Sequence, residues 1–218
     1  YIDSYTLHPD GHALAMTVRG QLFSMANWEG GVLQHGEAGP VRHRVADWLN
    51  DGERLVAVSD ASGEDAFEIH QRDGSADIIR MEKYDIGRPV QVAVSPKKDE
   101  VVFTNHRHEL HYINIKRQSF YLLDRCEQDW IRDVSWSQDG RWIAYSYPTT
   151  DYKSRIKIMN VRTAESWFVT SDEFRDFRPA WDPEGKFLYF LSNRDFHPVY
   201  DQHHFELSFP QATRPYLL

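Results

Sequence analysis

His8-Pro9-Asp10-Gly11 is the first of five copies of a turn signature that recurs along this 218-residue chain. The other copies are Leu49-Asn50-Asp51-Gly52, Ser95-Pro96-Lys97-Lys98, Ser137-Gln138-Asp139-Gly140 and Asp182-Pro183-Glu184-Gly185. Successive copies start 41 to 46 residues apart, a period typical of β-propellers and other repeat architectures. Asp and Asn bond to nearby backbone in tight turns, and Gly adopts positive φ there. The third copy lacks its Gly, so we expect a longer or more strained turn.

The residues around each turn predict four strands per repeat. In the second repeat, Trp48 ends the run before the turn, an apolar run covers 55–58, and further runs cover 66–70 and 76–80. Near-alternation of apolar and polar residues gives a strand one covered face. In the last repeat we expect the third and fourth strands at 205–209 and 215–218. The sequence therefore predicts an all-β propeller of about five four-stranded antiparallel blades, at approximately 1–43, 44–87, 88–130, 131–175 and 176–218.

The repeat begins at an inner strand and ends at an outer one. No strand is therefore left over to complete one blade from both termini. Propellers have about four to eight blades, so five would be enough to close a ring. The missing latch favours an open ring or part of a larger one. Because Tyr1 is not an initiator methionine, we expect the chain to be processed, cloned or taken from within a longer polypeptide.

Composition narrows the class of protein. A net charge of −8 argues against a nucleic-acid surface. No run approaches the ~18 apolar residues that span a bilayer. The single cysteine, Cys126, forms no intrachain disulfide, which favours a reducing compartment. We expect a cytoplasmic protein that binds neither nucleic acid nor membrane and carries no cofactor.

Four arginines are the candidate functional residues of the predicted channel. They lie at or just before the start of an inner strand, the strand that lines the channel of a propeller, and they are Arg44, Arg88, Arg132 and Arg178. A collar of guanidinium groups would attract the carboxylates of peptides. Their spacing from the end of the inner strand is unequal. The structural alternative, which we favour, is neutralisation in blade-to-blade ion pairs by neighbouring acids, namely Asp47, Asp85, Asp133 and Asp176.

Other candidate sites receive simpler interpretations. His106, His108 and His111 would share an ion only on one strand, yet they fall across a predicted turn, so we expect solvated histidines and no metal. His203-His204 receives the same interpretation. No Gly-x-Ser-x-Gly occurs, so we expect no catalytic residue in this chain. At the equivalent place before three turns stand Trp48, Trp136 and Trp181, which we expect to pack between sheets.

Several stretches resemble the tricorn protease family. The most specific is RPAWDPEGKFLYFLSNR at 178–194, followed by PVYD at 198–201 and FELSF at 205–209. Less specific matches are IRDVSWS at 131–137, WIAYS at 142–146, YTLHPDG at 5–11 and VRGQLF at 18–23. The resemblance covers essentially the whole chain and points to the early part of the family's second, seven-bladed propeller.

The resemblance implies a non-catalytic part of a larger enzyme. In the family, the catalytic serine and histidine lie in domains that follow the propellers, and the second propeller is regarded as a filter for peptides. We therefore expect a substrate-gating domain of a cytosolic serine peptidase, whose partners are peptides, the remaining domains of the parent and further copies in a homo-oligomer. The alternative is a stand-alone TolB-like propeller that binds a protein or peptide.

Overall fold

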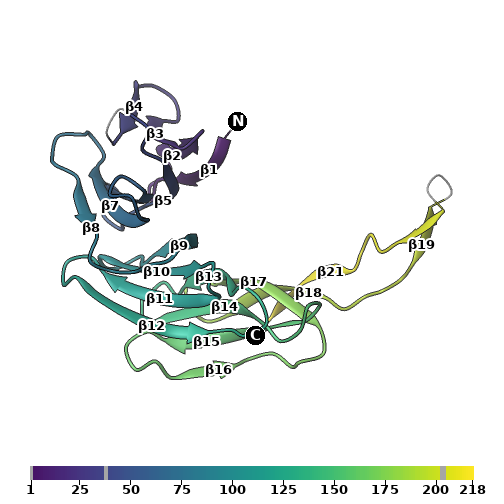
Figure 1. Ribbon diagram of the computed structural model, residues 1–218. Helices are drawn as coiled ribbons and strands as arrows, with labels where there is room; N and C mark the ends of the chain where they lie inside the picture. The colour runs from purple at the N-terminus through teal and green to yellow at the C-terminus, as the bar shows by residue number, and fades with distance from the viewer. Residues whose placement is uncertain (1, 37–38, 202–204) are drawn as a thin grey trace. The chain divides into compact units, whose positions relative to one another are not determined.

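Every regular element in the described residues is a β-strand. The computed structural model describes residues 2–36, 39–201 and 205–218, and these form 21 strands (Figure 1). The chain divides into two compact units, Tyr1–Asp124 and Arg125–Leu218. Within the described part of the chain, no helix is long and apolar enough to cross a membrane.

The first unit contains three four-stranded antiparallel sheets, here called blades 1 to 3. Blade 1 comprises β1 (Ile2–Leu7), β2 (Ala13–Val18), β3 (Gln21–Ala26) and β4 (Val32–His35). Blade 2 comprises β5 (His43–Trp48), β6 (Arg54–Ser59), β7 (Ala66–Gln71) and β8 (Ile79–Met81). Blade 3 comprises β9 (Pro89–Val94), β10 (Glu100–Asn105), β11 (Glu109–Asn114) and β12 (Ser119–Arg125). Strands neighbour one another in chain order within each sheet, as expected for propeller blades.

The second unit contains blades 4 and 5. Blade 4 comprises β13 (Arg132–Trp136), β14 (Trp142–Pro148), β15 (Ser154–Asn160) and β16 (Ser166–Phe168). Blade 5 comprises β17 (Arg175–Trp181), β18 (Leu188–Asn193) and β21 (Thr213–Leu217). One parallel pair, Ser154 with Arg175, connects the two sheets. The fold is thus the predicted all-β arrangement of repeated antiparallel blades.

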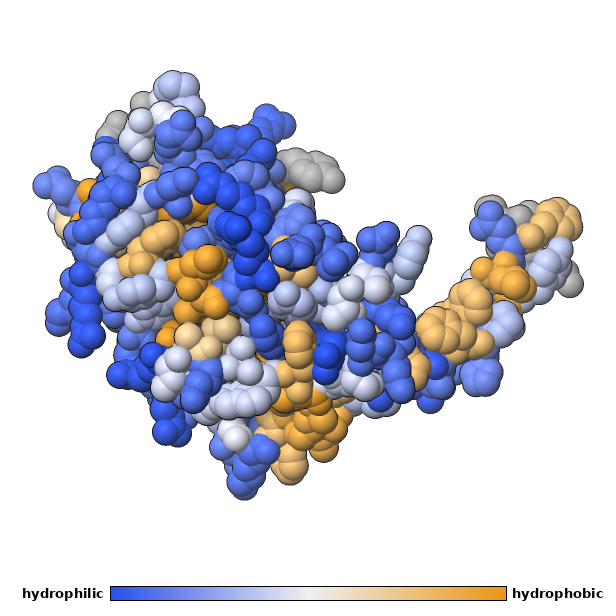
Figure 2. Space-filling view, turned by 60° about the horizontal axis from the view of Figure 1, so that its bottom comes forward, coloured by the Kyte–Doolittle hydropathy of each residue, from blue (hydrophilic) through white to orange (hydrophobic). Residues whose placement is uncertain are grey.

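The last blade differs from the prediction in one respect. The expected third strand at 205–209 does not join the sheet, because β20 (Glu206–Ser208) pairs with β19 (Val199–Asp201) in a separate hairpin. The strand that pairs with β18 at this edge is instead β21, where Tyr216 lies opposite Phe190 of β18. The hairpin projects from the sheet as an arm (Figure 1), and apolar side chains lie along it (Figure 2). The alternating pattern correctly predicted a strand in segment 205–209, but the prediction that this strand joins the sheet of blade 5 is wrong.

The five turns share one hydrogen-bonding scheme. The amide of the first turn residue donates to the carbonyl five residues later in all five copies, at 2.8 to 2.9 Å. In four copies the Gly amide also bonds back to the first residue, and these glycines have φ between +65° and +74°. The third turn has the same length, with Ser95 N donating to Glu100 O at 2.8 Å. The third turn is therefore not longer than the others, so that alternative of the prediction is wrong.

The core of the first unit lies between blades 2 and 3. Phe67 and Phe103 meet edge to face there, with ring centroids 5.0 Å apart, and both are fully buried. A smaller cluster places Trp48 against Ala13 and Ala15 of blade 1. Packing between sheets is thus confirmed for Trp48. In the second unit Trp136 is buried, and the Trp181 indole nitrogen donates to Ser135 O at 3.1 Å, which links blades 5 and 4.

Candidate functional site

A β-bulge interrupts the first strand of every blade. Between Arg44 and Asp47, two residues of β5 oppose one residue of β6, and the register of the first strand also shifts in blades 1, 3, 4 and 5. The first bulge residue has positive φ in three blades: Val45 at 49°, Asp133 at 56° and Arg178 at 51°. Bulges bend a strand and redirect side chains, and they often border functional sites. The bulge is therefore a feature that recurs in the first strand of each blade.

The candidate arginines cluster at these bulges but are not all equivalent. Arg44 and Arg132 each come directly before a positive-φ bulge residue. Arg178 is itself the bulge residue, one position further along. Arg88 precedes the first residue of β9. This arrangement explains the unequal spacing noted in the sequence.

In the first unit, Arg44 and Arg88 line one open cavity of about 330 Å³. Arg42 contributes a third guanidinium, and three acidic residues, Asp60, Glu64 and Asp65, share the lining. Arg44 forms an ion pair with Asp65, in which both side chains are mostly buried. Arg88 is exposed. The cavity thus combines a neutralised arginine with an exposed one.

In the second unit, Arg132 and Arg178 line a cavity of about 470 Å³. Arg132 lies 3.3 Å from Asp129 Oδ2, and its guanidinium stacks 5.4 Å from the centre of the Trp130 ring. Both candidate arginines are exposed. Residues 150–153 of the loop between β14 and β15 contribute to the lining, including Tyr152, which is 84 % exposed. Exposed cations beside aromatic rings suit peptide carboxylates and side chains.

The acids proposed as neutralising partners bind other groups. Asp85 pairs with Arg107 at 2.8 Å, and this pairing lowers the pKa of Asp85. Asp176 is buried and binds the Ser192 hydroxyl and Arg194. Asp47 accepts a hydrogen bond from the Thr6 hydroxyl at 2.8 Å, which connects blade 2 to blade 1.

Asp133 provides the corresponding contact in the second unit. Its carboxylate accepts the Arg178 amide at 3.1 Å, and so connects blade 4 to blade 5 through the backbone. The same oxygen accepts the Ser146 hydroxyl at 3.0 Å. Two of the four acids therefore do link blades, but through a hydroxyl and an amide. The acids that pair with the candidate arginines are Asp65 and Asp129, which the sequence analysis missed because they lie on adjoining loops.

Two of the histidines selected from the sequence, His106 and His108, lie in the predicted turn, but the prediction of a solvated histidine is wrong for His111, which is buried. Residues 106–108 form the turn between β10 and β11, and His108 has a positive φ of 62°. His106 Nδ1 accepts the Arg88 amide at 2.9 Å, while His111 lies inside the sheet, 2.9 Å from Glu109. His203 and His204 lie outside the described residues. Cys126 is buried and donates to Pro148 O at 3.3 Å.

Comparison with known proteins identifies the family. Residues 2–218 match the family described as the tricorn protease second β-propeller domain. This chain belongs to the tricorn protease family. Tricorn protease homologues of Saccharolobus solfataricus and Streptomyces coelicolor are 32 % and 31 % identical to it and cover 96 % and 94 % of its length. The chain spans only about a fifth of those relatives, 19 % and 20 %.

Solved structures support the propeller fold. The crystal structure of the tricorn protease superposes with a TM-score of 0.86 at 22 % identity, covering all of this chain and 21 % of that one. TolB from Acinetobacter baumannii gives a TM-score of 0.64 at 15 % identity, covering 91 % of this chain and 50 % of that one. At these identities the likeness concerns the fold. A tricorn-family chain thus presents arginines at repeated bulges.

Proposed function

We propose that this chain is the substrate-gating propeller of a cytosolic tricorn-type serine peptidase and supplies no catalytic group itself. The observation that carries the proposal is the family match over residues 2–218, in a chain about one-fifth as long as relatives named as proteases. In this proposal the domain acts on the substrate before the catalytic step. Its contribution is selection by width and charge.

The arginines at the bulges supply the charge in this proposal. Arg88, Arg132 and Arg178 are exposed in polar cavities beside the first strands. An exposed guanidinium attracts carboxylates at a distance, and the attraction weakens as salt shortens the Debye length. Acidic peptides and C-terminal carboxylates are therefore the ligands that these cavities favour. The Arg44–Asp65 pair serves to hold the bulge in blade 2.

The proposed partners follow from surfaces that the blades leave open. Blade 1 exposes Tyr5 by 73 % and Leu7 by 60 %, and blade 5 exposes Tyr189 by 43 %. Contiguous apolar exposure marks interaction surfaces. We propose that further blades of the parent peptidase cover these faces, and that the parent assembles as a homo-oligomer.

The test uses the full-length parent peptidase. Reversal of charge in Arg132→Glu with Arg178→Glu is expected to lower kcat/KM for acidic peptides several-fold more than for neutral peptides, with the difference shrinking in high salt. Arg162→Glu, an exposed arginine in the turn between β15 and β16, is the matched control. An equal fold-change in kcat/KM for acidic and neutral peptides, relative to the parent enzyme, would refute charge selection.

A second measurement separates the gating domain from a free-standing TolB-like binder. The intact mass of the native polypeptide is expected to be several times that of this chain, with peptidase domains in the same reading frame. Hydrolysis of peptides by the isolated chain would contradict the non-catalytic role. A native product no longer than this chain would instead favour the stand-alone propeller.

A further inference from the structure

Three ionisable side chains converge in the interior of blade 2. His43 begins β5, and Glu68 and His70 stand two residues apart on β7, so the latter two point to the same face of the sheet. Their side chains are only 1 %, 1 % and 3 % exposed. One nitrogen or oxygen of each lies within 4.8 Å of the others. The cluster is therefore compact, buried and rich in metal-binding atoms.

The two imidazoles approach one carboxylate oxygen. Nε2 of His43 and Nε2 of His70 each lie 3.1 Å from Glu68 Oε2. The His70 nitrogen is poorly aligned with that oxygen and has no hydrogen-bond partner among the described residues. A buried polar atom without a partner is destabilising and rare in native proteins, so it calls for an explanation.

Both spacings to the Glu68 oxygen fit tetrahedral coordination of a metal ion. Zinc binds nitrogen at about 2.0–2.1 Å and carboxylate oxygen at about 2.0–2.2 Å, so tetrahedral ligand atoms are roughly 3.3 Å apart. The two nitrogen–oxygen separations of 3.1 Å are close to that value. An ion among the three atoms would bind the lone pair that His70 leaves unused.

The donor atoms of the cluster also suit a metal ion. Arg80 donates to the other oxygen of Glu68, Oε1, at 2.7 Å. This hydrogen bond holds the carboxylate in place, with Oε2 directed to the imidazoles. Two imidazoles and one carboxylate form a donor set that zinc commonly takes.

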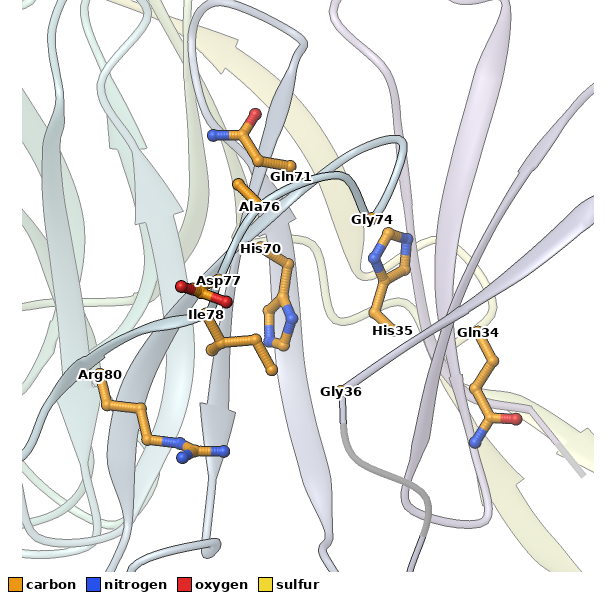
Figure 3. A pocket seen from close by; sticks show the side chains of 10 residues that line it. All are labelled: Gln34, His35, Gly36, His70, Gln71, Gly74, Ala76, Asp77, Ile78 and Arg80. Atoms are coloured by element: carbon orange, nitrogen blue, oxygen red, sulfur yellow. The ribbon is translucent and has the colours of Figure 1, made fainter.

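We propose that His43, Glu68 and His70 bind one divalent transition-metal ion, for which Zn²⁺ is the best match. Three protein ligands leave a fourth position for water or a small ligand. His70 lines an open cavity of about 410 Å³, together with His35, Gly36 and Arg80 (Figure 3). The cavity gives the ion an entry path. Because His43 directly precedes Arg44, the ion would fix β5 next to its bulge.

A second histidine cluster in the same unit provides a contrast. His8, Asp10 and His12 also have ligand atoms within 4.8 Å. Here both ring nitrogens of His8 are engaged, Nε2 with Gly52 O at 2.8 Å and Nδ1 with the Asp10 amide at 3.0 Å. Asp10 and His12 are exposed. The residue types of this cluster could bind a metal, but its buried histidine has no nitrogen left for one. The cluster therefore serves as the control for the zinc-binding test.

The experiment is a titration of the purified, EDTA-treated 218-residue chain with ZnCl₂ by isothermal calorimetry. The expected result is one ion per chain and a Tm that rises with zinc concentration, since a ligand of the native state stabilises it. X-ray absorption at the zinc edge should show nitrogen and oxygen ligands without sulfur. Absence of one-to-one binding to a folded chain, or sulfur in the coordination sphere, would overturn the proposal.

Matched variants locate the site. His70→Gln is expected to weaken zinc binding at least tenfold and to keep the far-UV circular dichroism of the parent, because His70 Nε2 makes no hydrogen bond that is lost. His12→Gln should bind zinc as the parent does. Equal loss in both variants, or unchanged affinity in folded His70→Gln, would show that the ion binds elsewhere. If His70→Gln does not fold, the stoichiometry and absorption spectrum of the parent chain still decide the question.

Discussion

Blades 2 and 5 share a turn signature and a bulge, yet they bury their strands very differently. In blade 2, five consecutive residues are buried in both β6 and β7. In blade 5, β18 alternates between buried and less buried positions, and most of β21 is exposed. Blade 2 has apolar clusters against both blade 1 and blade 3, whereas the described contacts of blade 5 lie on its blade 4 side.

This difference indicates that the strands of a propeller blade are buried mainly by the neighbouring sheets. A single blade has two faces and covers neither by itself, so stability grows with each interface between repeats. The apolar residues of β18 and β21 therefore resemble those of an inner blade in composition while lying partly exposed. The comparison can be tested by substitutions in one blade at a time, whose effects on the free energy of unfolding are then compared.

The largest effect is expected from emptying the core of blade 2. Phe67→Ala removes a fully buried ring that packs on Phe103, so the free energy of unfolding should fall by about 3–5 kcal/mol. Tyr189→Ala in blade 5 removes a ring that is 43 % exposed and should cost much less. Urea unfolding of the two variants measures both changes. Equal losses would mean that blade 5 is buried in solution.

A pH effect is expected where blade 1 faces blade 2. Burial, then the nearby His70 and His43, lower the pKa of His35 to about 4 from 6.5. The unfolded chain binds the proton first, so stability that is present above pH 6.5 is lost as the pH falls toward 4, by at most about 3 kcal/mol.

The measurement is urea unfolding of the metal-free chain at several pH values between 7 and 4.5. His35→Gln should flatten the pH dependence, although it also alters the 2.7 Å hydrogen bond between His35 and Ser24. His12→Gln, which changes an exposed histidine, should retain the slope of the parent. An unchanged slope in His35→Gln would assign the acid sensitivity to another group.

The turn repeat predicted most of the fold, because turn chemistry and strand alternation are local properties. Local pattern failed at 205–209, where the alternation that forms a sheet strand also forms the β19–β20 hairpin. The zinc cluster was missed for a related reason. Glu68 and His70 stand at strand spacing, but His43 joins them only through the pairing of β5, β6 and β7. The spacing of residues along the sequence does not show which strands pair with one another.

Gly36 tests how closely blade 1 approaches blade 2. Its φ is +85°, and a Cβ there would lie 2.5 Å from His43 Cε1. Gly36→Ala should therefore lower the free energy of unfolding by about 2 kcal/mol or more, from backbone strain plus a clash. Gly11→Ala, at φ +74° with nothing within 4 Å, carries only the strain. A smaller loss in Gly36→Ala than in Gly11→Ala would show that the ring moves aside.

The smallest change in stability is expected from removing one hydrogen bond between blade 5 and blade 4, the neighbour that covers one face of blade 5. Trp181→Phe removes the indole donor to Ser135 O while keeping an aromatic ring, so the free energy of unfolding should fall by about 1 kcal/mol. Trp167→Phe in blade 4 changes an indole that is 48 % exposed and controls for lost ring area. Urea unfolding, followed by far-UV circular dichroism because both variants lose a fluorophore, compares them. If Trp181→Phe cost no more than its control, the link from blade 5 to blade 4 would rest on the Asp133–Arg178 contact and the apolar cluster, and blade 5 would depend still more on a neighbour for its other face.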